Sequence, residues 1–367
     1  MNDYIACLLS IAANGLEAYY DPQTSLFSFI VTDLGRSPEK ANLLLTHSLI
    51  SLLGISNYKE SVHIDFSESK NRVYEQVAMK SGLRESALLL WLLAKENDPR
   101  SDIIFGKICA LPSNVIINAE TMEVAWLLTS LVFYAHQKRS EKTGKTMDAV
   151  SQHLKKRFNC DTCLFYHRPR NSFFSSFDIR YDIANFADQI YSIYAFALYY
   201  GLKRDGESLQ ISEQCADKIC SLQGKQGQWW WHYNVPRGTV IQKYPVYSVH
   251  QDSMAPFALM ELNKVSQKDY SSSISLGLQW LFSENELNVK LANEEKNYVR
   301  RGIQRKRFLA KLINVRTLVF KFMKIDCLSG YFDQPKYLCR MNWEYSYHLG
   351  WILYAYSPQT ENLWRKF

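Results

Sequence analysis

Helical spacing of apolar residues recurs along this chain, and it is the feature that most constrains the fold. The alternation typical of half-buried strands is scarce. Apolar residues follow helix spacing, over lengths beyond those of usual strands, at 86–95, 121–136, 185–202, 254–265, 274–282 and 304–322. We therefore predict an all-α protein that carries only short extended pieces in its loops.

A degenerate motif recurs between these segments: turn-forming polar residues stand directly before a large apolar or aromatic pair. It begins at Asp21, Asp98 and Asp161, and looser copies begin at Gln226 and Leu328. Such residues are expected where a helix ends and a short loop is pinned into a core. Their spacing fits a unit of two helices, so five or six helical hairpins would fill the chain. Closing the hairpins into a ring would leave a cavity at one end.

Two segments resemble known families. Residues 219–229 resemble the Gln…Gly-x-Trp repeat of terpenoid cyclases and prenyltransferases, and residues 277–287 are similar to a helix-ending segment of six-hairpin glycosidases. Both families are α/α toroids, so the resemblance implies one α/α toroid (barrel) domain over 1–367, with about five to six hairpins. The two families differ in chemistry, and the Asp-x-Asp-Asp acid motif of the cyclases is absent.

Composition and charge narrow the class of protein. The hydrophobic content of 47% and the aromatic content of 14% exclude a disordered chain. The net charge of +7 is concentrated in residues 293–324, which hold ten Lys or Arg and two Glu. We interpret 304–322 as an amphipathic outer helix with a solvated face. The alternative is contact with an anionic partner, either a membrane surface or an acidic glycan. No nucleic-acid-reading motif accompanies the charge.

The N-terminus and the cysteines favour a cytoplasmic protein. Asp3 precedes the first apolar stretch without any Lys or Arg, so we expect no signal peptide, and no apolar stretch has the length of a membrane span. The eight cysteines form no disulfide framework. Cys160, Cys163, His167 and His153 have short spacing that suits zinc, but a second Cys-x-x-Cys is missing, and we interpret the thiols as core residues. We expect neither a metal nor a cofactor.

The densest candidate site is the segment 228–254, where aromatic, basic and acidic residues alternate without a helical stripe. Burying this mixture in a simple core would be costly, whereas the rim of a cavity suits it. We predict substrate-binding roles for Trp229, Trp230, Trp231 and His232, and catalytic roles for Tyr244, Tyr247, His250 and Asp252. Asp252 has an alternative role as the N-cap of a helix that begins near Met254.

Two further segments supply candidates. Glu344 and His348, beside Trp343, are four residues apart and would share one helix face as an acid–base pair. The alternative for them is an ion pair that caps the last helix. Arg168 and Arg170 would clamp a carboxylate or phosphate, or remain solvated in a loop.

Asp188 lies near Tyr191 in an otherwise apolar segment. A lone carboxylate is costly there, so we expect it to pair with one of these arginines or with a ligand. Tyr191 is a further predicted substrate contact.

These candidates fit three functions. The first is a carbohydrate-active enzyme of six-hairpin type that binds a small molecule or an oligosaccharide. Hydrolysis would use Asp188, Asp252 and Glu344, whereas uronate lyase or epimerase chemistry would use Tyr244, Tyr247, His250 or His348 as bases. The second is a terpenoid-cyclase-like toroid, in which Trp229–Trp231 would stabilise a carbocation. The third is a helical scaffold without catalytic activity that presents its basic segment to an anionic partner.

Overall fold

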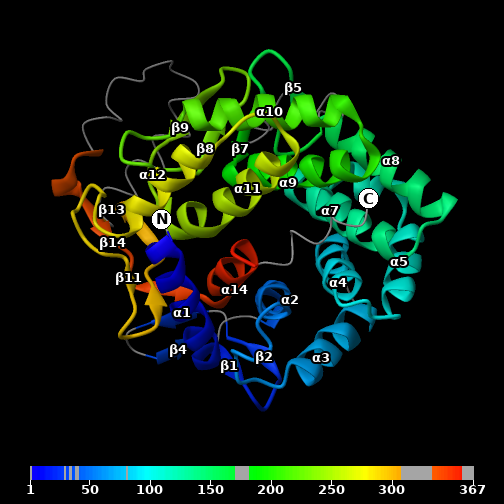
Figure 1. Ribbon diagram of the computed structural model, residues 1–367, viewed down its shortest axis with the longest axis horizontal. Helices are drawn as coiled ribbons and strands as arrows, with labels where there is room; N and C mark the ends of the chain where they lie inside the picture. Colours follow the sequence, from blue (N-terminus) through cyan, green and yellow to red (C-terminus); the bar gives the residue numbers. More distant parts are fainter. Residues whose placement is uncertain are drawn as a thin grey trace.

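The computed structural model describes residues 2–28, 30–32, 35–37, 41–79, 82–169, 182–306 and 333–357. Six helices form an inner ring, in which each packs on the next and the last packs on the first (Figure 1). The inner helices are α2 (Ala41–Ile55), α4 (Leu83–Lys95), α7 (Thr121–Gln137), α9 (Phe186–Lys203), α11 (Ala255–Val265) and α14 (Ser346–Ala355).

Six outer helices surround this ring, and each precedes an inner helix in the chain (Figure 1). The outer helices are α1 (Asn2–Tyr19), α3 (Phe66–Met79), α5 (Ser101–Cys109), α8 (Glu141–Lys155), α10 (Gly206–Ser221) and α12 (Ser271–Leu281). A short helix, α6 (Ser113–Asn118), lies between α5 and α7. The described helices thus pair into six hairpins, and the predicted α/α toroid is confirmed.

Apolar patterning separates the two layers. Helix α8 buries Met147, Val150 and Leu154, which recur at helix spacing on one face, and exposes charged residues on the other. Helix α9, from the same hairpin, buries fourteen of its eighteen residues. A helix that is apolar on every side must be covered on every side, so α9 lies inside the ring and α8 outside it.

Five of the six predicted helical segments are confirmed as α4, α7, α9, α11 and α12, with ends shifted by a few residues. The sixth, 304–322, is wrong at its start, because Gln304 and Arg305 belong to a strand. Residues 307–322 lie outside the described residues, so the rest of the predicted basic helix stays a prediction. No helix in the described part of the chain is long and apolar enough to cross a membrane.

Short strands occupy four of the connections that lead from an outer helix to an inner helix. The connection from α1 to α2 holds β1 (Tyr20–Asp21), β2 (Leu26–Phe27), β3 (Ile30–Thr32) and β4 (Gly35–Ser37), and the one from α8 to α9 holds β5 (Phe158–Asn159), β6 (Leu164–Phe165) and β7 (Ile183–Asn185). The connection from α10 to α11 holds β8 (His232–Asn234), β9 (Thr239–Gln242) and β10 (Val246–Tyr247). The connection from α12 to α14 holds β11 (Ala292–Asn293), β12 (Tyr298–Val299), β13 (Gly302–Arg305), β14 (Leu338–Arg340) and β15 (Trp343–Tyr345). All of their pairings are antiparallel.

The ring is closed by contacts between the two ends of the chain. Strand β15 pairs with β3, and α14 packs on α2 at two glycines. A Cβ atom added at Gly54 would lie 2.1 Å from the carbonyl oxygen of Gly350, and one added at Gly350 would lie 2.6 Å from the Cα atom of Ser51. Since no side chain fits between these backbones, glycine is required at both positions.

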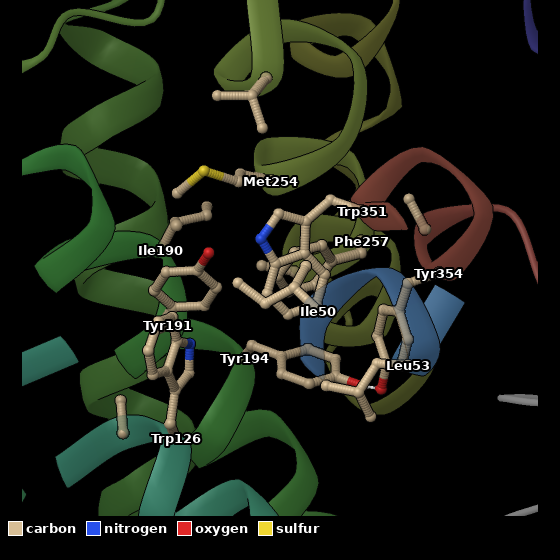
Figure 2. Close-up of a cluster of buried hydrophobic side chains, with 14 of the residues drawn as sticks. Ile50, Leu53, Trp126, Ile190, Tyr191, Tyr194, Met254, Phe257, Trp351 and Tyr354 are labelled. Carbon is tan, nitrogen blue, oxygen red and sulfur yellow. Dashed lines mark hydrogen bonds between the residues drawn. The ribbon is translucent and has the colours of Figure 1, made fainter. Parts of the chain in front are cut away.

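Aromatic side chains fill the middle of the inner ring (Figure 2). We call this group the aromatic plug; it consists of Trp91, Tyr191, Tyr194, Phe257, Trp351 and Tyr354, all nearly fully buried. Their ring centroids lie 4.8 to 6.3 Å apart in successive contacts. Tilted and edge-to-face pairs at these distances add to the stabilisation from burial. The plug therefore separates the two ends of the toroid.

Candidate active site

The N-terminal ends of the inner helices meet at one end of the ring. Side-chain and backbone contacts link these ends from one helix to the next. Arg84 of α4 contacts Glu123 of α7, and Met122 of α7 contacts Asp188 of α9. Phe186 of α9 contacts His250 before α11, Asp252 before α11 contacts His348 of α14, and Tyr347 of α14 contacts His47 of α2. Each helix N-terminus carries a partial positive charge. An end of the ring built in this way favours a bound anion.

Arg301 lies at this end between two tyrosine rings. Its guanidinium carbon is 4.4 Å from the ring centroid of Tyr247 and 3.8 Å from that of Tyr345. Its backbone N–H donates to the carbonyl oxygen of Trp343, which fixes the position of the arginine. Within the described ranges, no carboxylate lies at ion-pair distance from Arg301. The guanidinium therefore has donors available for an anionic ligand.

Other rings extend this arrangement. Tyr347 stacks on Tyr345 at 5.7 Å, and His47 meets Tyr347 edge-on at 4.6 Å. On the other side, Trp231 meets Tyr247 at 4.9 Å and stacks on His232 at 4.3 Å. We call this group the arginine–aromatic cluster: Arg301, Tyr247, Tyr345, Tyr347, His47, Trp231 and His232. Most of its members are half-buried, and such faces suit the C–H faces of a sugar.

Two imidazoles of this end of the ring, His47 and His250, have a strongly lowered pKa. Burial, with a contribution from the charge of Arg301, lowers the pKa of His47 to about 3. Burial also lowers the pKa of His250 to about 3, and the Nδ1 atom of His250 has no partner among the described residues. At physiological pH these two imidazoles are neutral and add no positive charge beside Arg301.

Asp252 and His348 form a buried pair behind the cluster. The Nε2 atom of His348 lies 2.9 and 2.7 Å from the two carboxylate oxygens of Asp252. Burial raises the pKa of Asp252, although the nearby His348 opposes this shift. The predicted pairing of His348 with Glu344 is wrong, because His348 binds Asp252.

A π-helical turn places Asp252. The residues His250–Met254 form this turn, which runs directly into α11 (Ala255–Val265). Pro256 has no N–H and would clash with the carbonyl of Asp252 in a regular helix. The wider turn relieves the clash, and the freed carbonyl accepts a hydrogen bond from the hydroxyl of Tyr356 at 2.6 Å. Asp252 therefore lies inside the helical run, and its predicted N-cap role is wrong.

Glu344 belongs to β15 and not to a helix, since α14 begins at Ser346. Side chains alternate along a strand, so Glu344 points away from the face that Tyr345 presents to Arg301. Its carboxylate accepts the backbone N–H of Val299 at 2.8 Å. Burial raises the pKa of Glu344 to about 7. The shared helix face expected for Glu344 and His348 is thus wrong.

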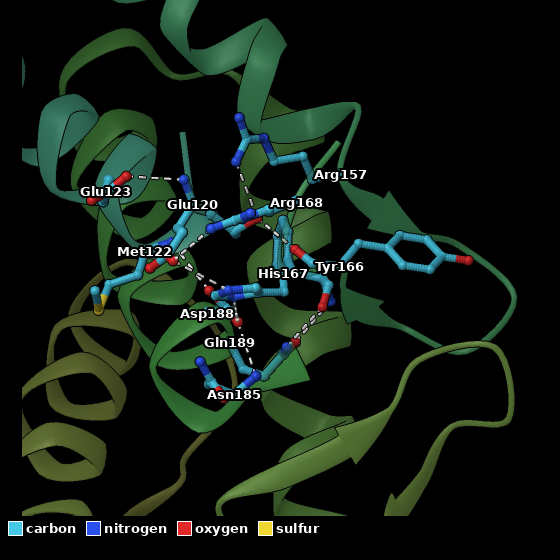
Figure 3. A network of polar contacts seen from close by, with 12 residues as sticks. Glu120, Met122, Glu123, Arg157, Tyr166, His167, Arg168, Asn185, Asp188 and Gln189 are labelled. Carbon is cyan, nitrogen blue, oxygen red and sulfur yellow. Dashed lines mark hydrogen bonds and ion pairs between the residues drawn. The ribbon is translucent and has the colours of Figure 1, made fainter. Parts of the chain in front are cut away.

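Asp188 is fully buried in the first turn of α9, where it joins three segments (Figure 3). It accepts the backbone N–H groups of Asn185 and Met122, and one oxygen lies 2.9 Å from Nδ1 of His167. Although burial opposes the charged imidazole, the bonds to Asp188 and Glu120 raise the pKa of His167 to about 10. The partner of Asp188 is therefore His167, not the expected arginine.

Several cationic side chains lie near the carboxylate of Glu120 at the start of α7 (Figure 3). Arg168 lies 3.1 Å from Glu120, and Arg84 lies 3.4 Å from it and 2.9 Å from Glu123. The bond from His167, together with these arginines, lowers the pKa of Glu120 to about 2. Arg168 was predicted to bind a carboxylate or phosphate, and the carboxylate that it binds is that of Glu120, a residue of the protein itself. Arg170, its predicted partner in binding, lies outside the described residues.

A shallow pocket of about 320 Å³ opens at the same end, between the starts of α4 and α7. Glu85 and Glu123 line it. Glu123 is held by Arg84, whereas Glu85 accepts a hydrogen bond from the hydroxyl of Thr46 at 3.1 Å. Thr46 directly precedes His47 of the cluster. The pocket thus holds two carboxyl groups, and Glu85 is linked through Thr46 to the helix that carries His47.

Of the remaining predicted residues, Trp343 forms a hydrogen bond with the cluster, and the following contacts of the others are with residues outside it. Trp229 is fully buried beside Phe186, and Trp230 donates to the carbonyl of Leu222. Tyr244 donates to Glu286, and burial with that charge raises the pKa of Tyr244. Tyr191 belongs to the aromatic plug. Trp343 contributes its carbonyl oxygen to the backbone N–H of Arg301.

The suggested zinc ligands do not converge. His167 binds Asp188 and Glu120, the Sγ atom of Cys163 contacts the carbonyl of Cys160, and Cys160 is exposed. Throughout the described part of the chain, no group of three or more His, Cys, Asp or Glu side chains is arranged to hold a metal ion.

No protein-family model and no curated protein sequence matches this chain. Solved structures match it over almost their whole length. An unsaturated glucuronyl hydrolase specific for heparin superposes with a TM-score of 0.63 at 11% identity, covering 100% of this chain and 98% of its own. The unsaturated glucuronyl hydrolase of Bacillus sp. GL1, responsible for the degradation of glycosaminoglycan, gives 0.60 at 13% identity, covering 98% and 97%. A sugar epimerase from a ruminal bacterium gives 0.61 at 8% identity, covering 95% and 96%. This likeness establishes the six-hairpin toroid fold.

Sequence reasoning missed Arg301, Tyr345, Tyr347 and His47. Arg301 enters the sequence analysis only as one of the ten basic residues of 293–324. The available signal was the density of tyrosines at 345 and 347 beside Trp343, next to residues already chosen. Nothing local in the sequence connects them with Arg301.

Proposed function

We propose that this protein is a carbohydrate-active enzyme that binds an acidic sugar at the N-terminal end of its inner ring. The observation that carries the proposal is Arg301, held between Tyr247 and Tyr345 with no carboxylate partner among the described residues. A uronate matches this arrangement, because its carboxylate can accept two N–H bonds from a guanidinium while its ring packs on tyrosine. The converging helix N-termini add a favourable field.

Glu85 and Glu123 are the proposed catalytic carboxyl groups. They line one pocket at the same end of the ring, and their contacts differ. Glu123 forms an ion pair with Arg84, whereas Glu85 accepts a hydrogen bond from the hydroxyl of Thr46. Sugar hydrolysis needs one carboxyl group that donates a proton and one that activates water or stabilises charge. We assign the proton-donating role to Glu85. The two pocket carboxyl groups take the place of the predicted Asp188, Asp252 and Glu344, which are buried, whereas Glu85 and Glu123 line an open pocket.

The assignment of substrate class also revises the interpretation of the basic segment 293–324. Arg301 belongs to that segment, and so does Arg305, which is buried and lies 2.5 Å from Asp333. In this proposal Arg301 contacts the ligand, while Arg305 forms an internal ion pair. An acidic glycan is the anionic partner that fits Arg301. The cytoplasmic location stays a prediction.

Turnover of a disaccharide with an unsaturated uronate end tests the proposal, since the loss of its conjugated double bond is followed by ultraviolet absorbance. The substrate class is the one named by the structurally similar glucuronyl hydrolases. Arg301→Gln should raise KM at least tenfold, and Glu85→Gln should lower kcat at least a hundredfold. Arg237→Gln and Glu75→Gln, at exposed positions, are the matched controls.

Wild-type protein that neither binds nor converts any uronate oligosaccharide would contradict the enzyme proposal and favour the scaffold alternative. Conversion of a polyprenyl substrate, with no loss in Arg301→Gln, would favour the cyclase alternative.

The pair of His348 and Asp252 supports a second candidate, epimerisation of a reducing sugar. His348 is oriented by Asp252, and His250, two residues before Asp252, is a neutral imidazole. Two imidazoles on one site can remove and return a proton beside a carbonyl. Incubation of a reducing disaccharide in D2O tests this candidate: deuterium at the carbon next to the carbonyl, lost in His348→Gln, supports it, and unlabelled sugar contradicts it.

A further inference from the structure

The connection from α8 to α9 carries two cysteines in one tight turn. Strands β5 and β6 pair at Asn159 and Leu164, and the four residues between these two form the turn. Cys160 and Cys163 are the first and the last of the four, so each is bonded directly to one member of that pair. Paired Cα atoms on antiparallel strands are about 4.5–5.5 Å apart. The two cysteines therefore lie opposite each other, at a separation that a disulfide can span.

The two thiols are placed for contact with each other and with solvent. The Sγ atom of Cys163 lies 3.7 Å from the carbonyl oxygen of Cys160, so this side chain turns back over the loop towards its neighbour. Cys160 is exposed, and its Sγ atom lies 4.0 Å from a carboxylate oxygen of Asp161. A small molecule in solution can thus reach the pair through Cys160.

The hairpin of β1 and β2 has the same turn. The last turn residue donates its backbone N–H to the carbonyl of the preceding strand in both hairpins, from Ser25 to Asp21 and from Cys163 to Asn159, and both bonds measure 2.8 Å. The backbone is left-handed at the last turn residue in both, with φ of 56° at Ser25 and 58° at Cys163. The two turns therefore share one backbone conformation.

The β1–β2 turn forms this conformation without any thiol. Pro22 and Ser25 stand where the β5–β6 turn has Cys160 and Cys163. A left-handed backbone is uncommon for a residue with a Cβ atom, and a cysteine does not favour it. The turn does not need its two cysteines in order to fold, so we look for their role in thiol chemistry.

The buried thiols of α10 are poor competitors for this chemistry. Cys215 is fully buried, and its Sγ atom lies 3.6 Å from Oε1 of Gln189. Burial, with contributions from the neighbouring Cys163 and Cys220, raises the pKa of Cys215. Burial also raises the pKa of Cys220 to about 11. Only a thiolate attacks a disulfide, so both groups are unreactive at neutral pH.

We propose that Cys160 and Cys163 are a reversible redox-active dithiol, held ready by the turn and oxidised by a low-molecular-weight disulfide. The thiolate of Cys160 attacks one sulfur of the oxidant, which forms a mixed disulfide and releases one thiol. The thiolate of Cys163 then attacks the sulfur of Cys160 and releases the second thiol. The protein loses two electrons and two protons, and the oxidant gains them as its two thiols.

Equilibration of the full chain with mixtures of reduced and oxidised glutathione tests the proposal. Free thiols are trapped with an alkylating reagent, and the peptides are mapped by mass spectrometry. We expect a bond between Cys160 and Cys163 that increases with the share of oxidised glutathione and disappears on addition of dithiothreitol. The absence of this bond in oxidised glutathione alone, or a bond between Cys163 and Cys215, overturns the proposal.

A single substitution separates the two steps. In Cys163→Ser the reaction should stop at the mixed disulfide, so glutathione should stay bound to Cys160, whereas the wild type releases it. Equal amounts of bound glutathione in the two proteins would contradict the assigned role of Cys163. The double variant Cys160→Pro/Cys163→Ser carries the residues of the β1–β2 turn, so it should fold and form no disulfide. A disulfide in this variant would place the reactive thiols elsewhere and overturn the proposal.

The reverse exchange tests the role of the turn itself. Pro22→Cys and Ser25→Cys, made together in the double variant, move the cysteine pair to the β1–β2 turn. Because the backbone conformation is the same, the moved pair should oxidise over the same range of glutathione mixtures as the wild-type pair. A moved pair that stays reduced where the wild-type pair is oxidised would show that the turn does not hold the thiols ready, and would contradict the proposal.

Discussion

Nε2 of His348 lies 2.7 Å from a carboxylate oxygen of Asp252 across a separation of 96 residues. Both side chains are almost fully buried, one in the first turn of α14 and the other in the π-helical turn before α11. The pair therefore joins the last two inner helices at the end of the ring where the cluster lies. Breaking it leaves one polar group buried without its partner.

We expect Asp252→Asn and His348→Gln each to lower the free energy of unfolding by roughly 3–5 kcal/mol, as for buried pairs. The double variant should lose less than the sum of the two. A urea-denaturation double-mutant cycle measures the coupling. The exposed pair of His63 and Glu17, also 2.7 Å apart, is the matched control and should show coupling of about 1 kcal/mol or less. Equal coupling in the two cycles would contradict the argument from burial.

The pKa of His167 predicts a loss of stability in alkali. The folded protein holds this proton up to a pKa of about 10, whereas an unfolded histidine has a pKa of about 6.5. The stabilisation is therefore complete below about pH 6.5 and is lost as the pH rises to about 10. Urea midpoints measured across this range should fall in the wild type. The fall should be smaller in His167→Gln and unchanged in His153→Gln; an equal fall in all three would contradict the assignment.

Gly54 and Gly350 face each other across α2 and α14, so a methyl group added at either position should lower the free energy of unfolding. Gly350→Ala should destabilise the protein by at least about 1–3 kcal/mol, the usual range for overpacking, because its Cβ would overlap the backbone of α2. Gly144→Ala, in the outer helix α8, meets nothing within 4 Å and should stabilise by roughly 0.5–1 kcal/mol. Thermal melts of the two variants give the comparison, and shifts in the same direction would rule out the close approach as the cause.

The rings around Arg301 predict graded effects on substrate affinity. Tyr345→Phe retains the aromatic face and should leave KM for a uronate substrate within about twofold. Tyr345→Leu removes the face and should raise KM by about 2- to 30-fold, which corresponds to roughly 0.5–2 kcal/mol of cation–π attraction. Steady-state kinetics of both variants test this, and indistinguishable KM values would show that the ring does not position Arg301.

The helices were predictable because burial on one side or on all sides leaves a periodic mark in the sequence, as α8 and α9 show. The loop motif was partly informative. The copies at Asp21, Asp161 and Gln226 do lie between an outer and an inner helix, but Asp98 lies between α4 and α5, in the reverse connection. A turn needs the same residue types in either connection. The motif therefore could not show whether a given turn leads from an outer to an inner helix or from an inner to an outer helix.

The site was less predictable, because its contacts join residues that are distant in the chain. Tyr247, Trp231, His232 and His250 were chosen from local composition, and the structure brings them together. The partner of Asp188, His167, lies 21 residues earlier in the connection between α8 and α9, and no local pattern joins the two. Glu344 and His348 were assigned to one helix, but α14 starts between them. A spacing of four residues has meaning only where the backbone is helical.

The aromatic plug has a consequence for the way a sugar polymer would be handled. A toroid that is filled across its middle cannot let a polysaccharide thread through it, so the substrate must enter and leave by the same side. We therefore expect attack at chain termini, with complete release of the shortened chain between successive turnovers. Product profiles from a long uronate polymer should show single terminal units, and not a ladder of internal fragments.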